Sequence, residues 1–227
     1  MAVERHERQS RSSHYPDITA LSYAQLLKEV PETKFGSLWR WGEHASAEDL
    51  DLAARGLIAA TDSQERLAHL RIFGLRRFPL GVSALLALVG VAGDRIGLAT
   101  VKALTQVTHP DVRALAFRLM ETKDPARAGA IGLLSSNYVH GDHAVVLRWF
   151  EEEDDRDIRH SMGRDLINYW RRYPEGDAEA LMPRALYEKG PCSFCRESAV
   201  RGVRLECELS HSRVGQSYTT GLGRSAE

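Results

Sequence analysis

Apolar residues recur with a helical period along most of the chain. Between Val112 and Leu119 they fall at positions i, i+3, i+4 and i+7, which places them on one face of a helix. Between Ile158 and Trp170 an apolar residue stands at every fourth position. No alternating run rich in Val, Ile and Thr is bounded by the Asn-Gly or Asp-Gly turns of a β-hairpin. The pattern therefore predicts an all-α protein.

The expected helices are short, and so are the segments that join them. Ser46 can cap one helix, Asp142 can cap another, and Pro79 suits the first turn of a third. Such a pattern is typical of stacked antiparallel hairpins and not of long bundle helices. We expect helices over residues 20–30, 48–60, 64–75, 80–90, 94–107, 126–134, 142–150, 158–170 and 178–188, with two more that begin near 109 and 193.

A short pattern recurs at three of these helix starts. Asp111 and Arg113 begin the first copy, Asp157 and Arg159 begin the second, and Arg196 belongs to the third. The arginines are 46 and 37 residues apart, near the period of about 40–47 residues in HEAT and armadillo repeats. An Asp at a helix start satisfies free backbone N–H groups, and an Arg two residues later can reach a neighbouring repeat. The pattern favours a repeat array, although any amphipathic helix with an Asp cap would look similar.

The copies resemble a known repeat class. The segment HPDVRALAFRLM (109–120) resembles the first half of a HEAT hairpin, and DDRDIRHSMGRDL (154–166) and FCRESAVRGV (194–203) resemble weaker copies. The run PCSFCRESAV, with Tyr187-Glu188 before it and Glu206-Cys207 after it, resembles the C-terminal end of a bacterial group of HEAT-like proteins of unknown activity. That resemblance covers most of residues 50–213. It implies a HEAT-like stack of helical hairpins, an α-α superhelix, with an irregular helical domain as the alternative.

Composition divides the chain into three parts. Residues 1–16 are charged and Ser-rich, and residues 214–227 are rich in Gly, Ser and Thr, so both are expected to be flexible tails. Residues 17–213 then form the helical repeat domain. The longest apolar run, residues 80–92, is shorter than the roughly 20 residues that span a bilayer, which predicts a buried helix and no membrane contact.

Charge and cysteine content narrow the function classes. Lys+Arg total 30 and Asp+Glu total 31, for a net charge of -1, which argues against a dedicated nucleic-acid binder. Three cysteines do not fit a disulfide framework, and they indicate a reducing compartment. The polar N-terminus shows no signal peptide. We therefore expect a cytoplasmic protein.

The sharpest candidate for chemistry lies near the C-terminus. Cys192 and Cys195 form a Cys-x2-Cys pair, and Cys207 and His211 follow, so the four make a candidate Cys3His zinc site. One difficulty is that the chain would have to fold back over about 18 Å of helix to close this site. Small buried thiols that pack between hairpins are the alternative. A redox role for the Cys-x2-Cys pair is less favoured, because no βαβ pattern surrounds it.

Other polar groups are weaker candidates. The sequence His140-Gly141-Asp142-His143 is explained by a glycine turn with an Asp cap and needs no metal. The chain has no HExxH, P-loop, GxGxxG or GxSxG motif. Its tryptophans invite comparison with HEAT-like DNA glycosylases, which act on an exposed nucleotide, but no catalytic pattern matches. These are Trp39, Trp41, Trp149 and Trp170.

The leading functional hypothesis is a non-enzymatic α-solenoid scaffold that binds a protein partner on its concave face. Near-neutral charge, the repeats and the lack of a catalytic constellation favour it. The alternatives are a HEAT-like nucleic-acid module of the glycosylase kind, which needs a continuous basic groove with a Trp and a carboxylate, and a cofactor chaperone or lyase, which needs a large apolar pocket. No cofactor is expected other than zinc at the cysteine cluster.

Overall fold

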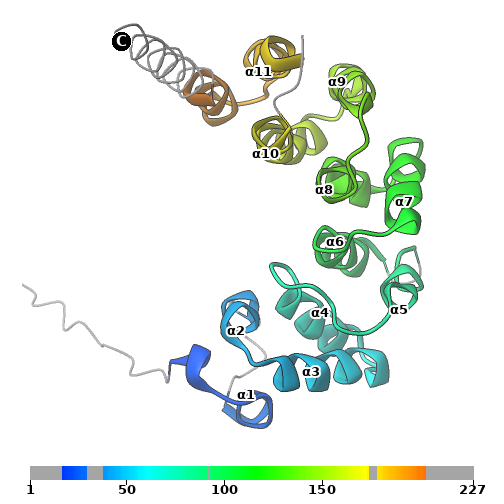
Figure 1. Ribbon diagram of the computed structural model, residues 1–227, viewed down its shortest axis with the longest axis vertical. Helices are drawn as coiled ribbons and strands as arrows, with labels where there is room; N and C mark the ends of the chain where they lie inside the picture. Colours follow the sequence, from blue (N-terminus) through cyan, green and yellow to red (C-terminus); the bar gives the residue numbers. More distant parts are fainter. Residues whose placement is uncertain (1–16, 30–37, 91–92, 174–177, 203–227) are drawn as a thin grey trace, which may run out of the picture.

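The computed structural model describes residues 17–29, 38–90, 93–173 and 178–202 (Figure 1). These residues form helices and no strand, which confirms the all-α class for this part of the chain. None of the described helices has the length and apolar character that crossing a membrane requires. The elements are η1 (Ile18–Ala20), α1 (Tyr23–Glu29), α2 (Leu38–His44), α3 (Ala47–Ala59), α4 (Ser63–Ile72), α5 (Val82–Leu86), α6 (Gly93–Leu104), α7 (Pro110–Met120), η3 (Pro125–Gly129), α8 (Ala130–Ser136), α9 (Asp142–Glu152), α10 (Arg156–Arg172), α11 (Ala178–Lys189) and a helix over residues 193–202.

The helices follow one another along an arc in two rows (Figure 1). The inner row, on the concave side, contains α2, α4, α6, α8, α10 and helix 193–202, and the outer row contains α3, α5, α7, α9 and α11. Neighbours within the inner row pack on each other, as α4 does on α6 and α8 does on α10. The inner helices α4, α6, α8 and α10 also pack on an outer helix next to them in sequence, as α4 does on α3 and α8 on α7. Side chains on the inner row are therefore placed by contacts from two directions.

One continuous apolar core runs between the rows. The i+4 series of α10 is buried as expected, from Ile158 through Met162 and Leu166 to Trp170. The face of α7 that begins with Val112 is buried in the same way. Because these apolar faces are buried, the exposed side chains of α10 are polar or charged, among them His160, Arg164 and Arg171.

Some element boundaries differ from the expectation. The helix expected over residues 80–90 is confined to Val82–Leu86, and i→i+3 turns follow it, with Leu88 N–H bonded to the Leu85 carbonyl and Val89 N–H to the Leu86 carbonyl, up to Gly90 with φ 84°. The N-cap of α9 is Gly141, with φ 95°, and not Asp142. The expected helix over 126–134 is divided into η3 and α8. In each case the turn chemistry decides the boundary, while the apolar pattern indicates only that a helix is present.

A short helix, α2, was not expected from the sequence. Tertiary contacts hold it: Trp41 is fully buried, and its Nε1 donates to the carbonyl of Leu21 at 2.7 Å. A Cβ at Gly42 would lie 2.1 Å from the Ile72 carbonyl oxygen, so α2 and α4 are in backbone contact at this glycine. Seven residues provide too little periodicity to predict such a helix.

An arginine makes the same contact at the start of three inner helices. In each case its guanidinium donates to the carbonyl six residues earlier, at the end of the preceding outer helix. This bond satisfies a carbonyl that the helix end leaves free. The pairs are Arg66 with Ala60 at 2.9 Å, Arg159 with Glu153, and Arg196 with Gly190 at 3.2 Å.

The residue four positions before each of these arginines caps the inner helix. Asp62 and Asp155 each accept two backbone N–H bonds in the first turn, which lowers the pKa of both carboxyl groups. The third helix has Cys192 in the equivalent place, and its Sγ accepts from the Cys195 N–H at 3.4 Å. A cysteine thus occupies a capping position that is acidic in two other hairpins.

Arg113 behaves differently because it lies on the outer helix α7. Its guanidinium makes two bonds to the Asp142 carboxylate, one of them 2.7 Å long, and donates to the Asn137 carbonyl at 3.0 Å. Asp111 lies in the first turn of α7, whose N-cap is His109. Of the five residues at the expected repeat starts, Asp157, Arg159 and Arg196 lie on inner helices and the other two on an outer one.

Candidate metal centre and the adjoining groove

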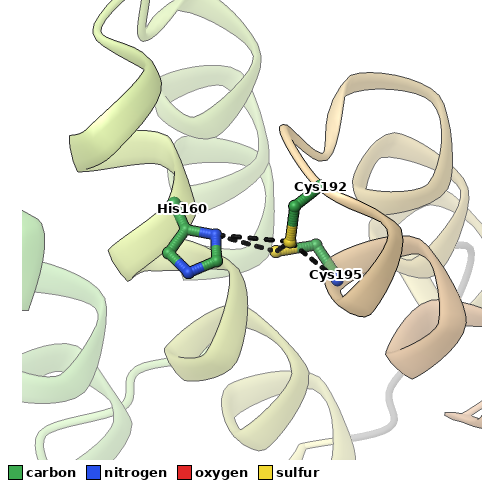
Figure 2. A group of neighbouring side chains, drawn as sticks. All are labelled: His160, Cys192 and Cys195. Carbon is green, nitrogen blue, oxygen red and sulfur yellow. Dashed lines mark hydrogen bonds between the residues drawn. The ribbon is translucent and has the colours of Figure 1, made fainter.

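Three potential metal ligands meet where the first turns of α10 approach the start of helix 193–202 (Figure 2). His160 comes from α10, and Cys192 and Cys195 come from the Cys-x2-Cys pair. The Nδ1 of His160 lies 3.4 Å from Cys192 Sγ and 3.5 Å from Cys195 Sγ. The two sulfurs are 3.4 Å apart. All three side chains point toward one position between the helices.

Local sequence explains why the two cysteines converge. The Gly190-Pro191 step ends α11, and Cys192 then caps the next helix, so that Cys195 lies one turn further on the same side. Room for the Cys195 thiol comes from glycines. A Cβ at Gly163 would lie 3.3 Å from its sulfur, and one at Gly190 would lie 3.1 Å from its Cβ.

The two thiols have different environments. Hydrogen bonding from the Cys195 backbone N–H lowers the pKa of the half-buried Cys192 thiol. Burial raises the pKa of the Cys195 thiol to about 11, since its residue is only 5% exposed. Cys192 is therefore the thiol that ionises more readily, and a bound cation would favour the thiolate form of Cys195.

The sequence-based ligand set is brought together only in part. Cys192 and Cys195 do converge, while Cys207 and His211 lie outside the described residues. His160 was not among the expected ligands. The sequence feature that could have indicated His160 is the 37-residue spacing between Arg159 and Arg196. This spacing aligns the first turn of α10 with the first turn of helix 193–202 in the repeat.

A groove adjoins the cluster on the same two helices, with a volume of about 540 Å³. His160 and Cys195 line one part of it. Its basic side chains are Arg164, Arg171 and Arg201, and its other lining residues are Ser161, Gly163, Ile167, Asn168, Phe194 and Ser198. Phe194 is 69% exposed, so the groove presents a large apolar ring to solvent. No carboxylate is among the described residues that line it, but Arg201 is paired with Glu197 beside it at 2.6 Å, so Arg164 and Arg171 are the groove arginines left for a partner.

The other polar candidates have structural partners. Asp142 is buried against Arg113 and accepts from the Val139 backbone N–H at 2.9 Å. The Nε2 of buried His143 lies 2.7 Å from the Tyr173 carbonyl oxygen. Both residues join α9 to its neighbours, and these contacts account for them without a metal.

The tryptophans do not form a binding surface on the groove. Trp41 and Trp170 are buried in the core. Trp149 is half-buried on α9 of the outer row, and Trp39, on α2, is far along the chain from the groove. Comparison of the chain with models of protein families, with curated proteins and with solved structures finds no match.

Proposed function

We propose that this protein is a non-enzymatic, HEAT-like α-solenoid that binds an acidic, amphipathic segment of a protein partner in the groove between α10 and helix 193–202. The observation that carries the proposal is the composition of the groove, which combines arginines with an exposed apolar surface and contains no carboxylate among its described lining residues. Two rows of helices along an arc, with recurring Asp–Arg and Cys–Arg caps on the inner row, support the solenoid part.

The groove suits a short helix or extended segment with both acidic and apolar residues. A volume of about 540 Å³ admits a few side chains and not a folded domain. Apolar side chains of the partner would contact the exposed ring of Phe194. Its carboxylates would pair with Arg164 and Arg171, for which a planar guanidinium is well suited. Recognition of this kind follows the helix-in-groove mode.

A nucleic-acid module of the glycosylase kind has less support. It requires an exposed Trp and a carboxylate on the floor of a basic groove, whereas Trp170 of α10 is 1% exposed. Asp165, the half-buried acidic residue of α10, is directed at α8, with its Oδ2 3.2 Å from where a Cβ at Gly132 would lie. The overall charge of -1 does not favour phosphate binding either.

A direct test uses fluorescence anisotropy with two labelled probes and the full chain. One probe is a synthetic helical peptide that carries Glu on one face and Leu on the other, and the second is a single-stranded oligonucleotide of equal charge. We expect the peptide to bind and the Arg164→Glu/Arg171→Glu variant to bind it at least about tenfold more weakly, since two charged contacts are lost. The matched control is Arg118→Glu/Arg148→Glu, on exposed positions of the outer row.

The alternative outcomes are distinct. If both charge-reversal variants lower the affinity for the peptide equally, the effect comes from net charge, and the groove is not the peptide-binding site. If the oligonucleotide binds and the peptide does not, the nucleic-acid function replaces the proposed one. A photo-crosslinking residue at position 194, compared with one at the exposed outer position 187, then identifies the natural partner from cell extract treated with nuclease.

A further inference from the structure

We propose that His160, Cys192 and Cys195 bind one Zn²⁺ ion through Nδ1 and the two Sγ atoms, with a water molecule in the fourth position. The proposal does not depend on the protein-binding function of the groove. It replaces the Cys3His set that sequence spacing suggested by a set that joins two inner helices of the array.

The geometry of the three ligand atoms matches a tetrahedral site. With Zn–S bonds of about 2.3 Å and Zn–N bonds of about 2.0–2.1 Å, tetrahedral angles separate two sulfurs by about 3.8 Å and a sulfur from a nitrogen by about 3.6 Å. The observed separations are 3.4 Å between the sulfurs, and 3.4 and 3.5 Å between sulfur and nitrogen. Small side-chain rotations are sufficient to close the difference.

The donor set selects the metal. Two thiolates and an imidazole are soft to borderline ligands that suit Zn²⁺, whereas Mg²⁺ and Ca²⁺ prefer oxygen. Binding forms two Zn–S bonds and one Zn–N bond, and the two thiol protons pass to the buffer. The complex of one Zn²⁺, two thiolates and one neutral imidazole has no net charge, so the half-buried position carries little electrostatic cost.

The surrounding structure holds the ligands in advance. Cys192 is fixed as a helix cap by its bond from the Cys195 N–H. Gly163 and Gly190 leave space for the Cys195 thiol beside α10. A pair of free thiols that only filled space between hairpins would not need a histidine from the adjacent helix in contact with both sulfurs. The convergence of three donors on one point is what indicates a metal and not simple packing.

The site has a structural consequence for the array. A bound ion would link α10 to helix 193–202 at their first turns, in addition to the apolar packing of the array. Cys195 and His160 also line the groove, so the ion would fix one end of it. We assign water to the fourth position because the described residues supply three donors to the group, and the Cys207→Ser variant below tests this assignment.

The test is metal binding by the full chain after removal of metals with EDTA and reduction of the thiols. Zn²⁺ is titrated against a chromophoric chelator, and Co²⁺ is used as a spectroscopic substitute. We expect one ion per chain, a sulfur-to-cobalt charge-transfer band and the intense visible bands of tetrahedral cobalt. His160→Ala and Cys192→Ser should each lower the affinity for Zn²⁺ by more than about 100-fold. Substitution of a residue that only hydrogen-bonds to a metal ligand typically lowers it by roughly 10- to 100-fold.

Two controls keep the result interpretable. Circular dichroism shows whether each variant is folded, and Cys192→Ser is suited to this because Ser is itself a good helix cap. Cys207→Ser removes a thiol outside the described residues and should retain Zn²⁺ binding within about threefold, a difference of less than about 1 kcal/mol. Zn²⁺ affinity that is unchanged in His160→Ala, or lost in Cys207→Ser alone, would overturn the assignment. Rapid formation of a Cys192–Cys195 disulfide with no metal uptake would also overturn it.

Discussion

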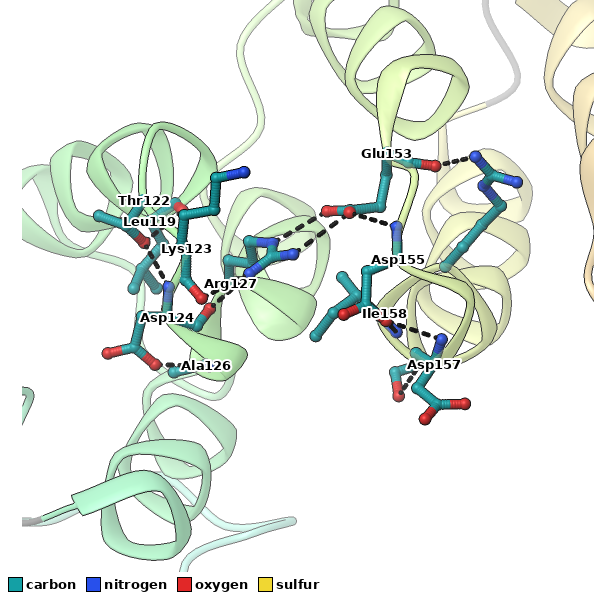
Figure 3. A network of polar contacts seen from close by, with 12 residues as sticks. Leu119, Thr122, Lys123, Asp124, Ala126, Arg127, Glu153, Asp155, Asp157 and Ile158 are labelled. Carbon is teal, nitrogen blue, oxygen red and sulfur yellow. Dashed lines mark hydrogen bonds and ion pairs between the residues drawn. The ribbon is translucent and has the colours of Figure 1, made fainter.

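Arg127 and Glu153 form an ion pair between two hairpins, with Nε 2.9 Å and Nη2 3.2 Å from the carboxylate oxygens (Figure 3). The side chains are only 10% and 9% exposed. Arg127 lies in η3 and also donates to the Lys123 carbonyl at 2.7 Å, while Glu153 accepts from the Asp155 backbone N–H at 2.9 Å. The pair therefore connects η3 with the short segment between α9 and α10.

Replacing Glu153 by Gln is expected to destabilise the protein by about 3 kcal/mol, the lower end of the range for removing one partner of a buried pair. Arg127 would keep its carbonyl bonds but lose its counter-charge in a site with little water. The measurement is chemical unfolding followed by circular dichroism. Glu151→Gln, at an exposed position two residues away, should change stability by less than about 0.5 kcal/mol. Equal effects of the two substitutions would mean that the pair contributes little.

The same pair predicts a sensitivity to acid. Hydrogen bonding and charge from Arg127 hold the pKa of Glu153 below its ordinary value of 4.5. A lowered pKa in the folded state contributes stability that is fully present above the ordinary value and is lost as the pH falls through the folded value. We therefore expect the unfolding free energy of the native sequence to fall more steeply below pH 4.5 than that of Glu153→Gln. Parallel profiles would contradict the assigned cause.

Gly42→Ala is expected to destabilise the protein strongly, by about 3 kcal/mol or more, because overpacking against backbone cannot be relieved by side-chain rotation. Its Cβ would lie 2.1 Å from the Ile72 carbonyl oxygen, which would separate α2 from α4. Gly81→Ala is the matched control, since a Cβ there meets nothing within 4 Å. Thermal unfolding of both variants tests this, and a Gly42→Ala protein as stable as the control would show that α2 can move away freely.

Helices with a long periodic face were predictable, whereas the short helix α2 was not. The start of α3 was expected because Ser46 is a capping residue, and its side chain accepts from the Asp49 N–H as the sequence suggested. The buried series of α10 was equally clear. Tertiary contacts, and not the local sequence pattern, determine that α2 forms, since Trp41 is held by the core and by the Leu21 carbonyl, which is distant in sequence. The split of the segment into η3 and α8 depends on turn geometry that apolar spacing does not encode.

The candidate site was predictable in its local part only. Cys192 and Cys195 are one helical turn apart, and their spacing identified them as donors. His160 lies 32 positions before Cys192, and an isolated exposed histidine gives no signal until α10 is placed beside helix 193–202. Spacing along the chain therefore indicated Cys207 and His211 as the remaining ligands and not His160. Arg159 and Arg196 occupy equivalent places in α10 and in helix 193–202, and this equivalence is the sequence feature that places His160 near the two cysteines.

Zinc should also stabilise the fold measurably, which gives a final prediction independent of spectroscopy. An ion that binds only the folded state adds about 2.7 kcal/mol when its free concentration is 100 times Kd. For a chain of this size each kcal/mol raises Tm by roughly 2–4 °C, so the expected increase is about 5–10 °C. Calorimetry of the full chain in buffered Zn²⁺ and in EDTA measures it. Cys192→Ser should unfold at a temperature near that of the EDTA-treated protein in both buffers, because Ser retains the cap but not the thiolate. A zinc-dependent increase that persists in Cys192→Ser would place the stabilising ion elsewhere in the protein.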